Sequence, residues 1–207
     1  MNQAVSIVGP GSAWAARAGA QPPIIVRMLP FRHAALALLL LSGLLACTPT
    51  LNWREVAAAP TSAHALLPCK PDHAERSVPL GGVPTELVVN GCKAGGATFA
   101  VMAATVAAGR LPDDLLQGWQ QATLSHMKAT GEVQRQPFHP AGALPLAHAQ
   151  RVVAQGQDAG GRAVYAQAVW TARAADGGGT ELVHAVMYSE RPQPEVANAF
   201  FGGLTWR

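Results

Sequence analysis

Histidine and paired acidic side chains are the residue types in this chain that suit acid/base or metal chemistry. Asp113 and Asp114 are adjacent at the start of a predicted helix. Aspartates favour the positive end of a helix dipole, so we interpret this pair as helix-start residues and not as a catalytic pair. Six histidines follow residue 47, and no two of them have i, i+4 spacing: His64, His73, His126, His139, His148 and His184.

No catalytic motif accompanies these residues. The nucleophile-elbow, Walker, His-Glu-x-x-His and dinucleotide-binding patterns are missing from the sequence. The pairs His126-Met127 and His184 with Met187 suit soft copper coordination, but we interpret the histidines as polar surface and the methionines as core. We therefore predict no metal, no cofactor and no catalytic residues.

Cys47 has the most distinctive surroundings of the three cysteines. It follows Arg32 and an apolar run, Ala34 to Leu45. The run of about 12 residues lies within the roughly 7–15 of a signal-peptide core and below the ~20 that span a bilayer. The ending Leu44-Leu45-Ala46-Cys47 resembles the lipobox of bacterial lipoproteins, whose cysteine is acylated and becomes the new N-terminus. A buried core helix, or a signal peptide with a chance cysteine, is the alternative.

The residues before this run suit a signal peptide only from Met28 onward. Residues 1–27 are rich in Gly, Ala, Ser and Pro, so we expect a mis-assigned or disordered extension, with the signal peptide at 28–46. Arg17, Arg27 and Arg32 account for three of the 15 basic residues, so 12 basic residues remain from Cys47 onward against 12 acidic residues. This balance removes the basis for a nucleic-acid partner.

Cys69 and Cys92 are the pair that remains once Cys47 is acylated. An exported protein holds them in an oxidising compartment, so a Cys69–Cys92 disulfide is the favoured state. Free thiols are the alternative. A metal or redox role is disfavoured because the two cysteines lack Cys-x-x-Cys spacing.

The chain after the signal peptide divides into a tether and one domain. We predict a lipidated tether over residues 47–63, which are rich in Ala, Pro and Thr. Trp53 in this tether could dock on the domain's own surface, meet the membrane interface or contact a partner. Residues 64–207 are long enough to form a single domain with its own core.

Glycine-rich turns divide the first half of this domain into short strands. The turns are Gly81-Gly82 and Gly95-Gly96. The connections are too short for parallel crossovers, so these strands should form an antiparallel meander. The predicted strands are Ala65–Pro71, Ala74–Pro79, Glu86–Cys92 and Ala97–Met102.

Two helices and a second group of strands follow. Pro112 suits the first turn of a helix that fades near residues 129–131, with Leu116, Trp119 and Met127 on its buried stripe. A short helix from Pro194 buries Val196, Phe200 and Phe201, and residues 204–207 then return to the body. Further strands are predicted within 132–146 and at Ala147–Gln157, Arg162–Ala172 and Thr180–Ser189. The order predicts an α/β (α+β) fold in which helices cover a mostly antiparallel sheet, after an N-terminal signal helix.

This order of elements resembles the PsbP-like fold, which the Ran-binding Mog proteins and bacterial DcrB-type lipoproteins share. The likeness lies in the opening Leu67-Pro68-Cys69-Lys70-Pro71, in two β-meanders around a helix, and in the closing Ala199-Phe200-Phe201-Gly202-Gly203-Leu204. Leu67 stands where that opening usually has Phe. The segment from Cys47 to Arg54 is also similar to the start of a group of uncharacterised lipoproteins from Gram-negative bacteria, which implies no catalytic residues.

These observations predict a non-catalytic binding or scaffolding lipoprotein of the cell envelope. Its partners would be the bilayer, through acylated Cys47, and an envelope protein or glycan. Thr48, in place of Asp, resembles the sorting pattern of outer-membrane lipoproteins and implies the periplasmic face of that membrane. A hydrolase-like enzyme that gathers His126, His148 or His184 beside a carboxylate is the second hypothesis, and metal trafficking is the third.

Overall fold

The computed structural model of the chain describes residues 50–207. The predicted signal peptide, Met28 and Cys47 lie outside the described residues. From Thr50 onward the chain forms one compact unit. No helix in this part is both long and apolar enough to cross a membrane.

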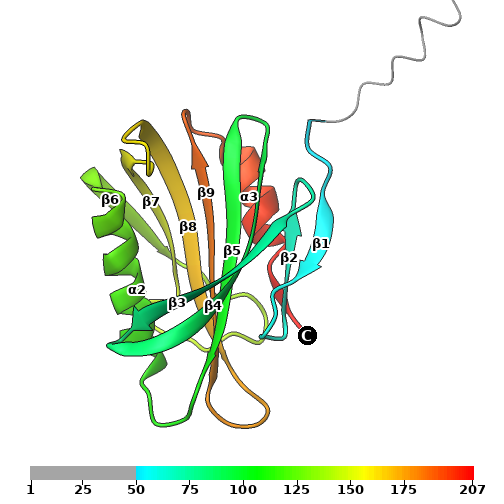
Figure 1. Cartoon of the computed structure of the whole chain (residues 1–207), viewed down its shortest axis with the longest axis vertical. Helices are drawn as coiled ribbons and strands as arrows, with labels where there is room; N and C mark the ends of the chain where they lie inside the picture. Colours follow the sequence, from blue (N-terminus) through cyan, green and yellow to red (C-terminus); the bar gives the residue numbers. More distant parts are fainter. Residues whose placement is uncertain (1–49) are drawn as a thin grey trace, which may run out of the picture. The chain divides into compact units, whose positions relative to one another are not determined.

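The main sheet of the described part has seven antiparallel strands in the order β3-β4-β5-β9-β8-β7-β6 (Figure 1). The prediction is confirmed for β3-β4-β5 and for β6-β7-β8-β9, and the pairing of β5 with β9 joins the two groups. The strand predicted at Ala65–Pro71 is not part of this sheet, because β2 (Ala63–Leu67) belongs to a separate small sheet. The strands are β3 (Asp72–Leu80), β4 (Val83–Ala94), β5 (Ala97–Val106), β6 (Thr130–Pro137), β7 (Gln150–Gln157), β8 (Ala163–Ala174) and β9 (Thr180–Ser189).

The central strands of this sheet are buried on both faces. β8 is buried without interruption from Ala166 to Ala172, and β9 from Leu182 to Met187. A strand that is apolar on both sides must be covered on both sides, because either bare face would leave a large apolar area in water. The sheet therefore needs two covering layers.

Helix α2 (Pro112–His126) covers one face. Its Leu115, Leu116 and Trp119 pack against Trp170 of β8 and Leu182 of β9. The predicted stripe is confirmed at Leu116 and Trp119, whereas Met127 is buried just beyond the helix end. In Figure 1 the hairpin of β3 and β4 crosses the same side of the sheet as α2.

The opposite face is covered by helix α3 (Pro194–Gly202) together with a small sheet. Phe200 and Phe201 of α3 are buried there, and the Phe200 ring meets Phe99 of β5 edge-on at 5.2 Å between centroids. The small sheet has the order β1-β2-β10, with β1 at Arg54–Ala57, β2 at Ala63–Leu67 and β10 at Thr205–Trp206.

Strand β1 differs from the expected tether over residues 47–63. Arg54–Ala57 pairs antiparallel with β2, and Ala58 and Ala63 belong to the core. Trp53 is half-buried, and its ring meets Phe99 at 6.3 Å. The ordered domain thus begins before residue 64, because this short segment gains its hydrogen bonds from β2.

A disulfide joins Cys69, just after β2, to Cys92 in β4, as predicted. The two Cα atoms are 6.0 Å apart, and the bond closes a loop of 23 positions. Closing such a loop restricts the unfolded chain and stabilises the fold by roughly 3 kcal/mol on the chain-entropy model. The bond ties the small sheet to the main sheet.

Gly156 of β7 sets where the end of α2 lies. The next residue, Gln157, donates its backbone N–H to the Met127 carbonyl oxygen at 2.7 Å. A Cβ on Gly156 would collide with that same carbonyl oxygen and would stand 2.8 Å from Met127 Cε. Glycine therefore lets β7 approach the residue that ends the helix.

Replacing Gly156 with alanine should move this helix end and destabilise the protein. We expect Gly156→Ala to lower the free energy of unfolding by roughly 1–3 kcal/mol, the usual cost of overpacking. The matched control is Gly118→Ala on the exposed side of α2, where an added Cβ meets nothing within 4 Å. That change should raise stability by about 0.5–1 kcal/mol. Urea unfolding measures both, and equal effects would contradict the argument.

Candidate functional site

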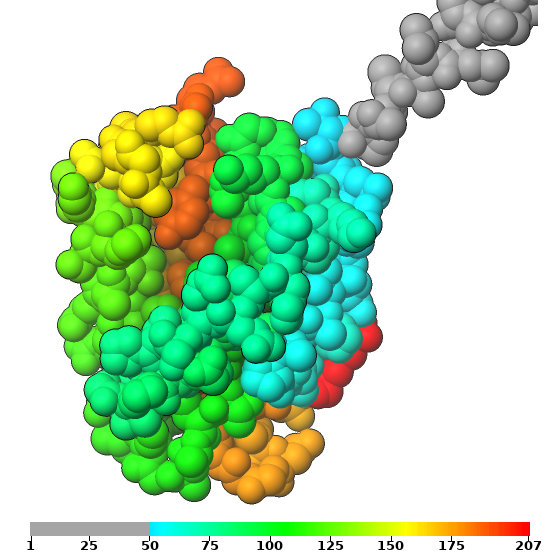
Figure 2. Space-filling model, in the orientation of Figure 1, coloured from blue at the N-terminus to red at the C-terminus, as the bar shows by residue number. Residues whose placement is uncertain are grey.

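A cavity of about 770 Å³ lies at one end of the main sheet, and we call it the end cavity. The β4–β5 turn, the β7–β8 turn and the residues at the end of α2 surround it. Figure 2 shows this end as a hollow, in which the orange surface of β9 lies deeper than the green β4–β5 hairpin and the yellow β7–β8 turn. Its size falls within the roughly 300–1,000 Å³ of small-molecule sites.

Two glycine-rich turns shape the rim. Gly95 and Gly96 both have positive φ, +57° and +73°, which favours glycine in this tight β4–β5 turn. In the β7–β8 turn Asp158 accepts hydrogen bonds from the backbone N–H groups of Gly160 and Arg162, at 2.8 and 3.0 Å. The Gly95-Gly96 turn predicted from the sequence thus forms part of the rim of the cavity.

The wall of the end cavity is apolar. Ala97 begins β5, Val164 lies in β8 and Met127 follows α2, and all three are buried. Tyr188 of β9 lines the same wall, and burial raises the pKa of its hydroxyl. A tyrosine hydroxyl is protonated at neutral pH, and burial favours that form further, so the Tyr188 hydroxyl can donate a hydrogen bond to a ligand.

The rim carries both signs of charge. Lys93 and Arg162 supply cations, and Asp158 and Glu190 supply carboxylates. The Arg162 guanidinium lies 2.7 Å from Asp158. Hydrogen bonds from Arg162, first from its backbone and then from its side chain, lower the pKa of Asp158, so this carboxylate stays ionised. An apolar wall below a polar rim suits an amphipathic ligand.

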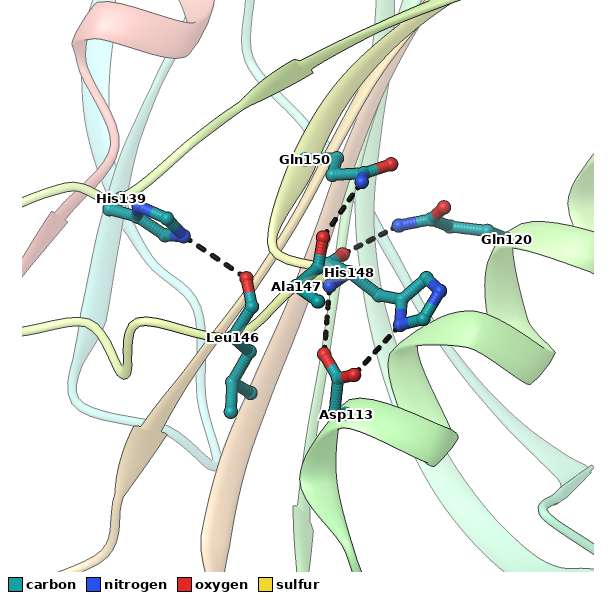
Figure 3. Close-up of polar contacts among 7 residues, drawn as sticks. All are labelled: Asp113, Gln120, His139, Leu146, Ala147, His148 and Gln150. Atoms are coloured by element: carbon teal, nitrogen blue, oxygen red, sulfur yellow. Dashed lines mark hydrogen bonds and ion pairs between the residues drawn. The ribbon is translucent and has the colours of Figure 1, made fainter.

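Asp113 and His148 form a second polar group at the opposite end of α2. Figure 3 shows the Asp113 carboxylate facing His148: one oxygen accepts the His148 backbone N–H and the other bonds Nδ1, each at 2.8 Å. Gln120 of α2 donates to the His148 carbonyl oxygen at 2.6 Å. Together these bonds clamp the segment before β7 onto α2.

Three effects act on the Asp113 carboxyl. Burial raises its pKa, but hydrogen bonds from the His148 backbone and side chain, and the His148 charge, outweigh burial, so the pKa lies below its usual value. The side chain of Asp113 is 32% exposed and that of His148 is 29% exposed. Asp113 and Asp114 lie in the first turn of α2, as interpreted from the sequence, but neither side chain caps the helix, because the N-cap residue is Leu111 with no side-chain cap. Asp113 binds His148.

His184 lies in the core of the α2 face. Its ring stacks on Trp170 at 4.2 Å with 5° between the planes, and Trp119 meets it edge-on at 5.3 Å. Nδ1 bonds the Val169 carbonyl oxygen at 3.1 Å. Burial lowers the pKa of His184 to about 4, so the ring is neutral at pH 7. The expectation that the histidines are surface residues is wrong for this one.

The structure separates the other sequence-predicted residues. His126 lines the end cavity, His148 is bound to Asp113, and His184 is buried between two tryptophans. Met187 belongs to the core on the α3 face, opposite His184, so these two cannot hold one ion. Within residues 50–207 no three His, Cys, Asp or Glu side chains group into a metal site.

The cavity residues escaped sequence reasoning because they come from four separate segments of the chain. Lys93, Met127, Val164 and Tyr188 have no shared motif or spacing. Two features of the sequence bear on this cavity: the glycine-rich turns, which place two hairpin turns at one end of the strands, and the end of the helix near residue 127. Neither signal predicts a hollow.

Removing the charge of Asp113 should weaken the clamp on α2. At pH 7 we expect Asp113→Asn to lower the free energy of unfolding by about 1 kcal/mol, because about a third of the side chain is exposed to water. The folded-state pKa is depressed, so the contribution is present above the unfolded value near 3.8 and is lost as pH falls through the folded value. Urea titrations at pH 7 and pH 3 measure it, with Asp114→Asn as control. A loss that persists undiminished at pH 3 would contradict this account.

Burial of neutral His184 should make the protein sensitive to mild acid. Between pH 6.5 and about 4 the unfolded chain binds a proton that the folded His184 does not, so stability falls as pH falls. We expect His184→Phe, which keeps an aromatic ring against Trp170, to reduce this loss by roughly 2–3 kcal/mol. Denaturant titrations across pH 4–7 test it, and parallel pH profiles for the two proteins would refute it.

Comparison with known proteins identifies no relative of this chain. No protein-family model matches the chain, and no curated protein or solved structure does. The end cavity is therefore the candidate site on physical grounds: it combines concavity, an apolar wall and convergent polar groups.

Proposed function

We propose that the protein is a cell-envelope lipoprotein whose domain binds a ligand in the end cavity without catalysing a reaction. The observation that carries the binding function is the cavity itself, with its apolar wall and charged rim. The lipobox-like ending at Cys47 supports the anchor. The Cys69–Cys92 disulfide supports an oxidising compartment, where such bonds persist.

We further propose attachment to the periplasmic face of the outer membrane. Thr48, which follows the acylated cysteine, supports this location through its resemblance to the sorting pattern. Several acyl chains on Cys47 would make anchoring stable, whereas one chain would be marginal. An envelope protein or glycan is the partner class for surfaces outside the cavity.

The PsbP-like fold remains part of this proposal. Its support is an antiparallel sheet covered on both faces, with the stretch from Leu67 to Pro71 after β2 and the stretch from Ala199 to Leu204 closing α3. A fold of this kind carries no single function, so the site decides.

A hydrolase-like enzyme is the alternative that one observation favours. His126, Asp158 and Glu190 line the same cavity, so a base and carboxylates face one space. The Asp158 carboxylate already accepts a hydrogen bond from Arg162, so it holds the β7–β8 turn and is less suited to acid/base catalysis. We therefore keep binding as the leading function.

Intact-mass spectrometry of protein extracted from membranes tests the anchor. We expect a mass that begins at acylated Cys47 and rises by two hydrogens on reduction of the Cys69–Cys92 bond. Cys47→Ser should remove the acyl mass and leave the disulfide unchanged. A wild-type mass that includes residues 28–46, with three free thiols, would reject the envelope location.

A further inference from the structure

The part of the chain that the structure describes begins at the same end of the domain as the end cavity. Leu51 packs against the β4–β5 turn, with its Cδ2 atom 3.0 Å from the place of a Cβ on Gly95, and Thr50 reaches within 3.8 Å of the same point. The next residue of the turn, Gly96, lines the cavity. Gln193 donates to the Gly95 carbonyl oxygen at 3.2 Å, which also holds this turn.

The short chain between Cys47 and Thr50 limits the distance between a lipid anchor on Cys47 and the cavity end of the domain. Cys47 precedes Thr50 by three residues. Three residues span at most about 11 Å when fully extended. If Cys47 is acylated as proposed, the cavity end of the domain would be close to the bilayer. The β3–β4 turn, near the start of α2, belongs to the other end of the main sheet.

The lining of the cavity selects the kind of molecule that could enter from a bilayer. Ala97, Met127 and Val164 offer an apolar wall, which suits an acyl chain. The rim has two cations, Lys93 and Arg162, and two carboxylates. A rim with balanced charge complements a zwitterionic head group better than an anionic one.

We propose that the end cavity binds a single-chain zwitterionic lipid, such as a lysophospholipid, taken from the membrane that holds the protein. The acyl chain lies along the apolar wall beside Met127 and Tyr188, and the head group stays at the rim near Lys93 and Glu190. A volume of about 770 Å³ suits one chain, because two-chain lipids exceed drug-sized ligands. This inference rests on the proposed function, since the anchor supplies the orientation.

Photo-crosslinking on vesicles tests the inference with the full acylated protein. The protein is reconstituted into phosphatidylcholine vesicles with lysophosphatidylethanolamine that carries a diazirine near the end of its acyl chain. After irradiation, peptide mapping should find the label on the peptides that contain Met127, Val164 and Tyr188. Label spread evenly over the domain would overturn the proposal.

Cavity-filling variants make the test specific. Thr98→Trp on β5 should reduce the labelling of these peptides by roughly tenfold. Ala163→Trp places the same ring at an exposed rim position and keeps the test valid if the first variant misfolds. The matched control is Val83→Trp, at a 50% exposed position at the start of β4, which should label like wild type. Equal labelling of all variants would overturn the proposal.

Two further experiments test whether a fatty acid or the protein's own acyl chains occupy the cavity instead. A diazirine fatty acid of the same chain length should label the cavity less than the lysolipid, and equal labelling would overturn the zwitterionic part. Labelling that occurs only in Cys47→Ser protein would mean that the protein's own acyl chains fill the cavity. Intact mass of the same sample distinguishes the two failures: an unacylated Cys47 rejects the proposed function, whereas acylated protein without cavity labelling rejects this inference alone.

Discussion

Burial of β8 and β9 on both faces is the constraint on which the rest of the structure depends. Two apolar faces demand two covers, and the chain supplies α2 on one side and α3 with the small sheet on the other. Helix α2 is shorter than the strands of the sheet that it covers. Fifteen helical residues extend about 22 Å, whereas the 12 residues of β8 extend about 40 Å. The end cavity lies where α2 ends and the strands continue.

Local patterns were sufficient to predict most of the elements. Glycine pairs bounded the hairpins, and the proline before Asp113 marked the helix start, because both act within a few residues. Strand β1 was missed for the opposite reason. Arg54–Ala57 has little strand propensity of its own and forms a strand through pairing with β2, a non-local interaction. The burial of His184 was missed for the same reason, because Trp170 and Trp119, which enclose its ring, lie 14 and 65 positions away in the sequence.

Neither the Asp113–His148 pair nor the end cavity could be predicted, because their members lie far apart in the sequence and meet only in the folded chain. Asp113 and His148 are 35 positions apart, and an aspartate at a helix start already has a sufficient local explanation in the dipole. The cavity poses the same difficulty: Lys93 and Tyr188 become neighbours because β4 pairs with β5 and β5 with β9. The Cys69–Cys92 bond was predictable because chemistry left few pairings for three cysteines.

The disulfide also links the fold to the proposed anchor. Asn52 donates its backbone N–H to the Pro68 carbonyl oxygen at 2.8 Å, and the next residue, Cys69, is bonded to Cys92 of β4. The segment nearest to Cys47 is thus fixed to the strand that forms the cavity rim. A long flexible tether would let the domain turn in any direction above a membrane, whereas an anchor only three residues before Thr50 would keep the cavity end close to the proposed point of attachment. The same bond that stabilises the fold would therefore orient the site.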